Sequence, residues 1–159
     1  MYLGRESDLK NSESKAFIAI GENSIRKSIF RKNKNEFKFS KIVHSTAIIA
    51  TNSLIQKGTF IGANVCINPL TKIGSFCIIN TGSIIEHECL IENFVHIGPS
   101  TVLCGNVKVG KNTLIGANTI INPNVKIGSN CVIGSGSVVV NNIPNYSRLT
   151  GNPVHYFIK

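Results

Sequence analysis

The sequence predicts a mainly β fold, a parallel solenoid that follows a short α/β segment, and three observations support this. A period of six residues runs from Val43 to Val138, sixteen times, without an insertion or deletion. The first residue of every unit is Val, Ile or Leu, and the fifth is Ala, Ser, Thr, Val or Cys. The second is Gly in seven units and Asn in three. Self-similarity at a short fixed period is typical of a repeat architecture.

Each unit predicts one short strand and one corner. In Val65-Cys66-Ile67 a small, a variable and a large aliphatic residue alternate, so two side chains point inward and the middle one outward. Gly and Asn tolerate positive φ, so we expect the second positions to form the sharp corners. These positions are Gly62, Gly74, Gly98, Gly110, Gly116, Gly128, Gly134, Asn68, Asn80 and Asn122.

The repeat resembles that of the hexapeptide acyltransferases, whose left-handed β-helix has three units in each triangular coil. The resemblance implies a left-handed parallel β-helix in this chain. With three units in each coil, every third unit contributes to the same face. The outward residues of one face are all apolar: Ile48, Cys66, Ile84, Val102, Ile120 and Val138. A contiguous apolar strip of this length marks an interface. It predicts self-association, which the homotrimers of the family favour, or a face covered by the chain's own terminal segments.

The sequence divides into three parts: an α/β segment over 1–42, the β-helix over 43–138 and a tail or cap over 139–159. Ala16 to Ile20 is apolar and predicts a buried strand. Asn23 or Ser24 is expected to cap a short helix in which Ile25 and Ile29 lie one turn apart. In the tail, Gly151-Asn152-Pro153 predicts a turn back along the coils.

Composition limits the classes of partner. The formal net charge is +9 and the pI is near 9.5, but the basic run at 31–34 is short and has no interleaved aromatic residues. We therefore expect no nucleic-acid binding, and a solvated basic face or an anionic small molecule accounts for the charge. Five Cys without a CxxC spacing argue against disulfides or zinc. No apolar run is long enough for a signal peptide or a membrane span, so a cytoplasmic protein is expected.

Charged residues crowd the repeat at Glu86-His87-Glu88. His87 is predicted to stand at a corner and point outward, and the residues one coil apart are Thr51, Pro69, Gly105 and Pro123, so the fold does not require a histidine there. A carboxylate beside an imidazole can hold its tautomer and raise its basicity, which is a general-base arrangement. A solvated polar corner is the alternative interpretation.

Around this corner the sequence is similar to the sugar acetyltransferases that modify sialic acid hydroxyls or the free amine of UDP-linked 4-amino sugars. The similarity extends from about Phe17 to Pro153. It is most specific at Asn80-Thr81-Gly82-Ser83-Ile84-Ile85-Glu86-His87-Glu88-Cys89, Phe94-Val95-His96-Ile97 and Cys104-Gly105-Asn106-Val107-Lys108-Val109-Gly110. It implies direct transfer of an acetyl group from acetyl-CoA to the amine or hydroxyl of a nucleotide-linked sugar, in bacterial surface-glycan biosynthesis, by a homotrimer with its sites between subunits. Direct transfer needs no Cys nucleophile.

The same resemblance implies a role for individual residues. His87 is the general base, and Glu88 orients it. The acceptor would contact Asn80 and Gly21. The cofactor would contact His96, Gly105, Ala117, Lys108 and Lys126, and no metal is expected. Gly105 would also direct its N–H at the oxyanion that develops during transfer.

Other interpretations stay open. Members of this family begin with a strand and a Gly-rich turn of a nucleotide-sugar-binding domain, which this sequence lacks. The alternatives are therefore a truncated, inactive homologue, or an enzyme with a different or smaller acceptor. A metal hydratase of carbonic-anhydrase type would need three converging histidines, whereas His44, His87, His96 and His155 are poorly spaced for one site. A non-catalytic binding solenoid would need a regular outward ladder of Thr, which the outward columns do not have.

Overall fold

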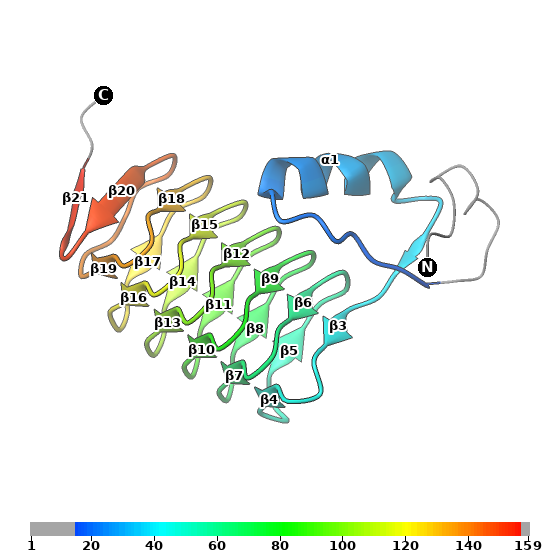
Figure 1. Cartoon of the computed structure of the whole chain (residues 1–159), viewed down its shortest axis with the longest axis horizontal. Helices are drawn as coiled ribbons and strands as arrows, with labels where there is room; N and C mark the ends of the chain where they lie inside the picture. The colour runs from blue at the N-terminus through cyan, green and yellow to red at the C-terminus, as the bar shows by residue number, and fades with distance from the viewer. Residues whose placement is uncertain (1–14, 157–159) are drawn as a thin grey trace.

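The computed structural model, which describes residues 15–156, is a parallel β-solenoid of three sheets with one helix against its side (Figure 1). The first face consists of β4 (Ile48–Ile49), β7 (Cys66–Ile67), β10 (Ile84–Ile85), β13 (Val102–Leu103), β16 (Ile120–Ile121) and β19 (Val138–Val139). The second face consists of β5 (Leu54–Ile55), β8 (Lys72–Ile73), β11 (Leu90–Ile91), β14 (Lys108–Val109) and β17 (Lys126–Ile127). The third face consists of β3 (Ile42–Val43), β6 (Phe60–Ile61), β9 (Ile78–Ile79), β12 (His96–Ile97), β15 (Leu114–Ile115), β18 (Val132–Ile133), β20 (Arg148–Gly151) and β21 (Val154–Tyr156). The predicted fold class is therefore confirmed.

Every strand pairs with the strand one coil away, in constant register. Ile84 lies beside Val102 and Cys66, for example, and Ile85 beside Leu103 and Ile67. The large aliphatic residues point inward and form one continuous core. The small inward residues are Ser, Thr or Cys in most coils because their side chains donate to a carbonyl of a neighbouring strand, as Thr71 Oγ1 does to the carbonyl of Glu86 at 2.9 Å.

The prediction for the corners is wrong in one respect, because positive φ occurs at a different position of the repeat unit. The left-handed conformation falls on the fourth residue of every unit from the third onward, as at Asn106 with φ 56° and Asn124 with φ 65°. Gly at the second position has another cause. A Cβ on Gly98 would lie 2.6 Å from the amide nitrogen of Ala117 in the next coil, so a side chain has no room there. The frequent Asn at the fourth position was the signal for the left-handed corner.

The segment before the solenoid also differs from the prediction. β1 (Lys15–Ala16) pairs in parallel with β2 (Lys38–Phe39), and only Ile18 of the predicted buried strand is buried. Helix α1 (Asn23–Asn33) is preceded by Glu22, so neither Asn23 nor Ser24 is its cap. Its buried residues are Asn23, Arg26 and Asn33, whereas Ile25 is exposed. The helix packs on a corner of the coils that exposes backbone carbonyls, and such a surface favours polar donors.

The coils continue beyond the last predicted unit. Ile143 bridges Ile127, and Leu149 of β20 pairs with Ile133 of β18, and both added residues are buried. This last coil is two residues shorter than the others, as the bond from Lys126 N to Asn142 Oδ1, 16 residues away, shows against 18 elsewhere. β21 then turns back antiparallel to β20, which agrees with the predicted turn in the tail.

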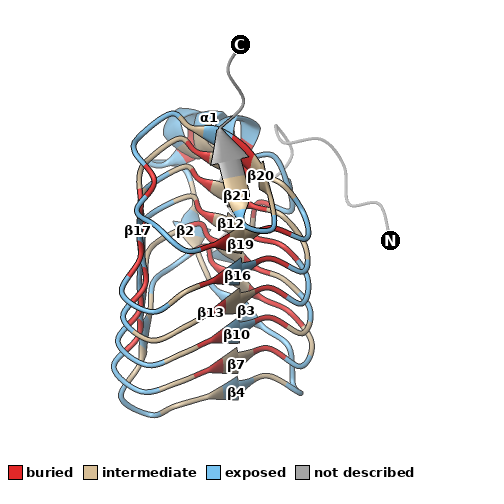
Figure 2. Cartoon of the chain, turned by 90° about the vertical axis from the view of Figure 1, so that its left-hand side faces the viewer, coloured by how far each residue is buried: buried red, intermediate tan, exposed pale blue. Residues whose placement is uncertain are grey.

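No terminal segment covers the first face within the described residues. Helix α1 lies along the opposite edge of the solenoid from the row β4 to β19 (Figure 1), and Figure 2 shows this row stacked at the surface. Its outward side chains remain open, with Ile48 70%, Ile120 42% and Ile84 38% exposed. The interpretation that the chain covers its own apolar strip is therefore wrong for residues 15–156.

Candidate active site

His87 and Glu88 form a hydrogen-bonded pair at the corner between the first and second faces. His87 Nδ1 lies 2.9 Å from Glu88 Oε2, and both side chains are 57% exposed. A carboxylate only accepts, so Nδ1 carries the hydrogen and Nε2 keeps its lone pair. An exposed, oriented imidazole with a free Nε2 is suited to take a proton from a bound group.

Glycine at position 105 makes room for this imidazole. A Cβ on Gly105 would lie 2.7 Å from both Cε1 and Nε2 of His87, so the ring lies directly over the glycine of the next coil. The Gly105 amide has no hydrogen-bond partner within residues 15–156. Some amides at the same position of other units donate to side chains, as Ser75 N does to Asn93 Oδ1 at 2.7 Å. A free N–H thus lies beside the imidazole.

Glu88 occupies a backbone conformation that glutamate rarely adopts. Its φ is 60°, at the corner position where the neighbouring coils carry Leu70, with φ of 64°, and Asn106, with φ of 56°. The left-handed conformation at this position is therefore set by the repeat. The conformation directs the carboxylate onto the ring of the preceding residue.

Cys77, Cys89 and Cys104 are poor candidates for a nucleophile. Burial raises the pKa of Cys77 to about 12 and that of Cys89 to about 11. Burial raises the pKa of Cys104 as well, and the nearby Glu86 carboxylate adds to this effect. Since the thiolate is the reactive form, these thiols stay unreactive at neutral pH.

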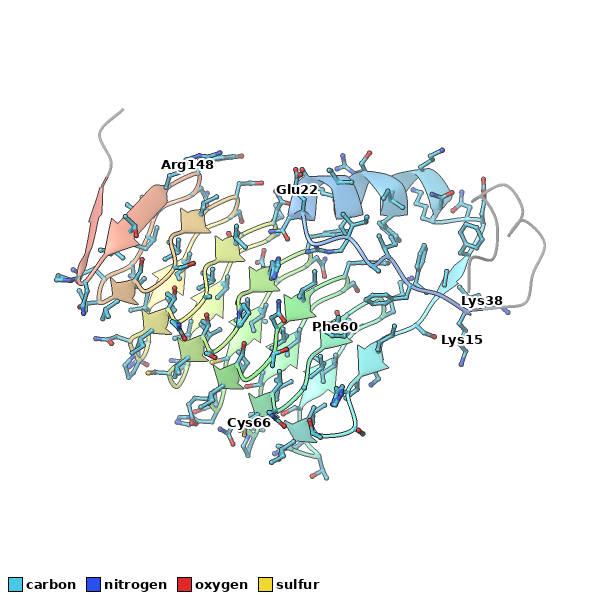
Figure 3. The ribbon with its side chains drawn as sticks, in the orientation of Figure 1. Lys15, Glu22, Lys38, Phe60, Cys66 and Arg148 are labelled. Carbon is cyan, nitrogen blue, oxygen red and sulfur yellow. The ribbon has the colours of Figure 1, made fainter. Side chains whose placement is uncertain are left out.

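Three predicted residues that are distant in sequence meet on the third face. Gly21, Asn80 and His96 line one small cavity of about 250 Å³, closed by Phe17 and Phe60. The two phenyl rings lie 6.4 Å apart, between centroids, where the chain leading to α1 passes over β6 (Figure 3). No sequence spacing could bring Gly21 to His96, because the contact depends on how the first segment lies on the solenoid.

His96 is held by its Nδ1, which lies 3.1 Å from the carbonyl oxygen of Gly21. Burial lowers the pKa of His96 below its usual value. The Gly21 carbonyl opposes this shift, while the charge of Arg26 adds to it. The imidazole is therefore neutral at pH 7, with the hydrogen on Nδ1 and the lone pair on Nε2.

A larger cleft beside this cavity was not predicted. Its volume is about 750 Å³ and it shares Gly21 and His96 with the smaller cavity. Glu22 at the start of α1 and Arg148 of β20 stand at its two ends (Figure 3). The combined space reaches from the apolar cavity to a charged rim, which is the usual layout of a small-molecule site.

The remaining predicted residues lie elsewhere. Lys108 and Lys126 are direct strand partners on the second face and line one shallow depression with Glu92. Ala117 lies at the corner between the third and first faces, beside Gly98. One chain therefore places its predicted residues at both edges of the first face, with His87 and Gly105 at one edge and Asn80 and Ala117 at the other.

Two further searches of residues 15–156 gave negative results. No three His, Cys, Asp or Glu side chains of this part of the chain are grouped closely enough to hold a metal ion. None of its helices has the length and apolar character needed to cross a bilayer. His155, counted among the histidines above, has a side chain outside the described part of the structure.

Comparison with known sequences places the repeat in a described family. Residues 88–122 and 106–141 match the family described as bacterial transferase hexapeptide (six repeats). The bifunctional protein GlmU of Desulfotalea psychrophila is 31% identical over 107 residues, which are 65% of this chain and 30% of that protein. The chain thus spans less than a third of this curated relative.

Solved structures match over nearly the whole chain. A histidine-to-asparagine variant of perosamine N-acetyltransferase from Caulobacter crescentus, in complex with CoA and GDP-perosamine, is 31% identical with a TM-score of 0.90. The match covers 92% of this chain and 70% of that one. The acetyltransferase domain of PglB from Neisseria gonorrhoeae is 28% identical with a TM-score of 0.92, over 98% of this chain and 78% of that one. WeeI from Acinetobacter baumannii, at 21% identity and a TM-score of 0.89, has the same fold.

We expect His96 to titrate below the pKa of 6.5 that an unperturbed histidine has, because burial disfavours its charged form. Below that pH the unfolded chain binds more protons than the folded one, so the free energy of unfolding should decrease as the pH falls through about 6.5. Histidine-selective ¹⁵N NMR over a pH series measures the titration, and His96→Gln assigns the signal. A His96 pKa at or above 6.5 would contradict the prediction.

Proposed function

Because the chain belongs to the hexapeptide-repeat family of sugar acetyltransferases, we propose that it transfers an acetyl group from acetyl-CoA to an amine or hydroxyl of a sugar. The proposed acceptor is nucleotide-linked and the proposed setting is the synthesis of bacterial surface glycans. The observation that carries the proposal is the His87–Glu88 pair standing over Gly105. The perosamine enzyme, in complex with CoA and GDP-perosamine, supports the choice of both substrates.

His87 acts as the general base in this proposal. Its Nε2 takes the proton of the acceptor amine or hydroxyl while the acceptor bonds to the acetyl carbon and the carbon–sulfur bond breaks. Glu88 holds Nδ1–H and stabilises the imidazolium that forms. The protonated His87 can then return its proton to the departing sulfur. No residue carries the acetyl group during transfer, which agrees with the raised pKa of the buried thiols.

The Gly105 amide supplies the second proposed catalytic group, after the base. Its N–H, which has no partner within residues 15–156, can donate to the carbonyl oxygen of the acetyl group as negative charge develops there. A single oriented donor of this kind typically contributes a factor of about 10²–10³ to the rate. The lack of a side chain at Gly105 therefore has two effects. It makes room for the imidazole of His87, and it leaves the backbone N–H of Gly105 accessible.

The chain has features that fit acetyl-CoA. When bound, acetyl-CoA supplies the acetyl group in activated form, as a thioester. Lys108 and Lys126 lie side by side with their charges on one exposed face. Adjacent like charges on neighbouring strands repel each other. An anion such as a phosphate group bound between them would remove this repulsion, so we assign them to the phosphates of the cofactor.

The proposed assembly is a homotrimer built on the first face. His87 and Gly105 lie at one edge of this open apolar strip, and Asn80 and Ala117 at the other. Copies that bury the strip around a common axis would bring unlike edges of neighbouring subunits together. The acceptor residues of one subunit would then face the base of the next, and each site would lie between two subunits.

Replacing the base should remove activity without unfolding the protein. His87→Ala is expected to lower kcat by about 10²–10⁴-fold, and Glu88→Gln by less, because glutamine keeps a hydrogen-bonding group. Thiol release from acetyl-CoA, measured against a panel of amino sugars and nucleotide-linked sugars, gives the rates. His44→Ala is the matched control, since the imidazole of His44 bonds Thr46 at an exposed corner. An active His87→Ala protein would refute the assignment of the base.

Neutralising the lysine pair should affect cofactor binding alone. The double variant Lys108→Met with Lys126→Met is expected to raise the KM for acetyl-CoA several-fold and leave kcat unchanged. The charges act on bound phosphate and not on the reacting atoms. Lys72→Met, on the same face, is the control. The same KM in the double variant and the wild type would contradict the phosphate assignment.

A charge on the first face should prevent assembly. Ile120→Glu is expected to convert a species of three times the 17.2 kDa chain mass into a monomer, because burying an unpaired carboxylate is costly. Light scattering after size-exclusion chromatography measures the mass. Leu54→Glu places the same charge on the second face and should leave the assembly intact. A monomeric wild-type chain would exclude the trimer.

A further inference from the structure

Arg26 of helix α1 is buried, at 1% exposure, and has no carboxylate partner. Each of its five N–H donors meets an uncharged oxygen instead. Nε bonds the carbonyl of Phe76 at 2.8 Å, Nη1 bonds those of Ile20 at 2.8 Å and Gly21 at 2.9 Å, and Nη2 bonds Asn23 Oδ1 at 2.6 Å and the carbonyl of Phe94 at 3.3 Å. A guanidinium has five donors, so its capacity is fully used.

Two of these acceptors belong to the solenoid. Phe76 and Phe94 occupy the left-handed corner position of successive coils, with φ of 58° and 61°. Neither carbonyl accepts a bond from the coil-to-coil ladder in the described part of the chain. Arg26 therefore fixes the helix to two backbone groups that the regular fold leaves available.

The other two carbonyls belong to the loop that reaches the cavity. The carbonyl of Gly21 accepts from Arg26 and lies 3.1 Å from His96 Nδ1. A carbonyl oxygen has two lone pairs, so it can serve both donors. Because it only accepts, its place between them fixes the hydrogen of His96 on Nδ1 and leaves Nε2 as an acceptor.

The guanidinium keeps its charge in this place. Burial lowers the pKa of Arg26 to about 10, which still leaves it protonated at neutral pH. The positive charge near His96 also disfavours a charged imidazole. Lysine could not reproduce the arrangement, because an ammonium is a compact charge without the planar fork that spans the helix, the loop and two coils.

We propose that Arg26 is a positioning residue for substrate binding: through the carbonyl of Gly21 it holds His96 as a neutral imidazole whose Nε2 accepts a hydrogen bond from an N–H or O–H of a bound substrate. The proposal rests on the proposed function for the identity of the substrate, but the imidazole geometry is independent of it. His96 lines both the small cavity and the larger cleft. Arg26 itself lines neither space, so it acts on a substrate through the loop and His96 and not by direct contact.

The tautomer of His96 tests the proposal without turnover. Long-range ¹H–¹⁵N correlation spectra of the histidine-labelled full chain distinguish hydrogen on Nδ1 from hydrogen on Nε2, and His96→Gln assigns the signal. The wild type should show Nδ1–H alone, and Arg26→Met a mixture of both forms. Arg26→Lys should also show a mixture, because it keeps the charge but loses the fork. An unchanged Nδ1–H signal in both variants would overturn the proposal, even if the wild type proved inactive as an acetyltransferase.

Kinetics then separates positioning from simple docking of the helix. Arg26→Met and His96→Gln should lower kcat/KM for the same substrate, by up to about 10²-fold, and the double variant should lose no more than His96→Gln alone. Phe30→Leu is the matched control, because Phe30 lies on the same helix with its ring centroid 4.3 Å from that of Phe76 and has no bond to Gly21. It should lower the Tm but leave the tautomer and kcat/KM unchanged. Additive losses in the double variant, or the same kinetic loss in Phe30→Leu, would show that Arg26 only docks the helix.

Discussion

The backbone ladder between coils is the constraint on which the rest of the structure depends. The strands from β3 to β19 have two residues each, and an inner strand such as β10 pairs with the strands one coil before and one coil after it. Constant register turns every position into a column of equivalent residues with the same surroundings. A residue that departs from its column has no structural reason to be there. His87 is such a departure, because the column around it holds Thr51, Pro69, Gly105 and Pro123.

The same constraint explains why the candidate site combines residues from adjacent coils. Neighbouring coils are so close that a large side chain at a corner fits only where the facing residue of the next coil has no side chain. His87 and Gly105 form such a pair, since a Cβ on the glycine would overlap the ring. Glu88 completes the group from the left-handed corner position, where its carboxylate turns back to Nδ1. The proposed base, its orienting carboxylate and a backbone N–H without a partner in residues 15–156 are thus brought together at one corner by His87, Glu88 and Gly105.

The sequence allowed the solenoid, its faces and the His87–Glu88 corner to be predicted, because each depends on a period or on adjacent residues. Features set by contacts across the chain were not predictable. The spacing of Ile25 and Ile29 suggested an apolar helix face, yet the helix buries Arg26 and Asn23 because it covers corner carbonyls. The last coil was not predicted because it is two residues shorter than the others and so interrupts the six-residue repeat, although Ile143 and Leu149 still fill the core. The meeting of Gly21 with His96 spans 75 residues and follows from the docking of the first segment alone.

A stacked prism of this kind has no hinge, so its site has to be completed by parts added to its surface. One added part is the segment from Phe17 through α1, which closes the cavity over the third face and is fastened there by the five donors of Arg26. In the proposed trimer the other is a second copy, because the first face separates the His87 edge from the Asn80 edge within one chain. Three separate contacts therefore position the parts of the proposed site. The ladder fixes the base, the helix fixes His96, and assembly through the apolar strip brings the two together across a subunit boundary, so catalysis in this proposal depends on a contact that no single chain can make.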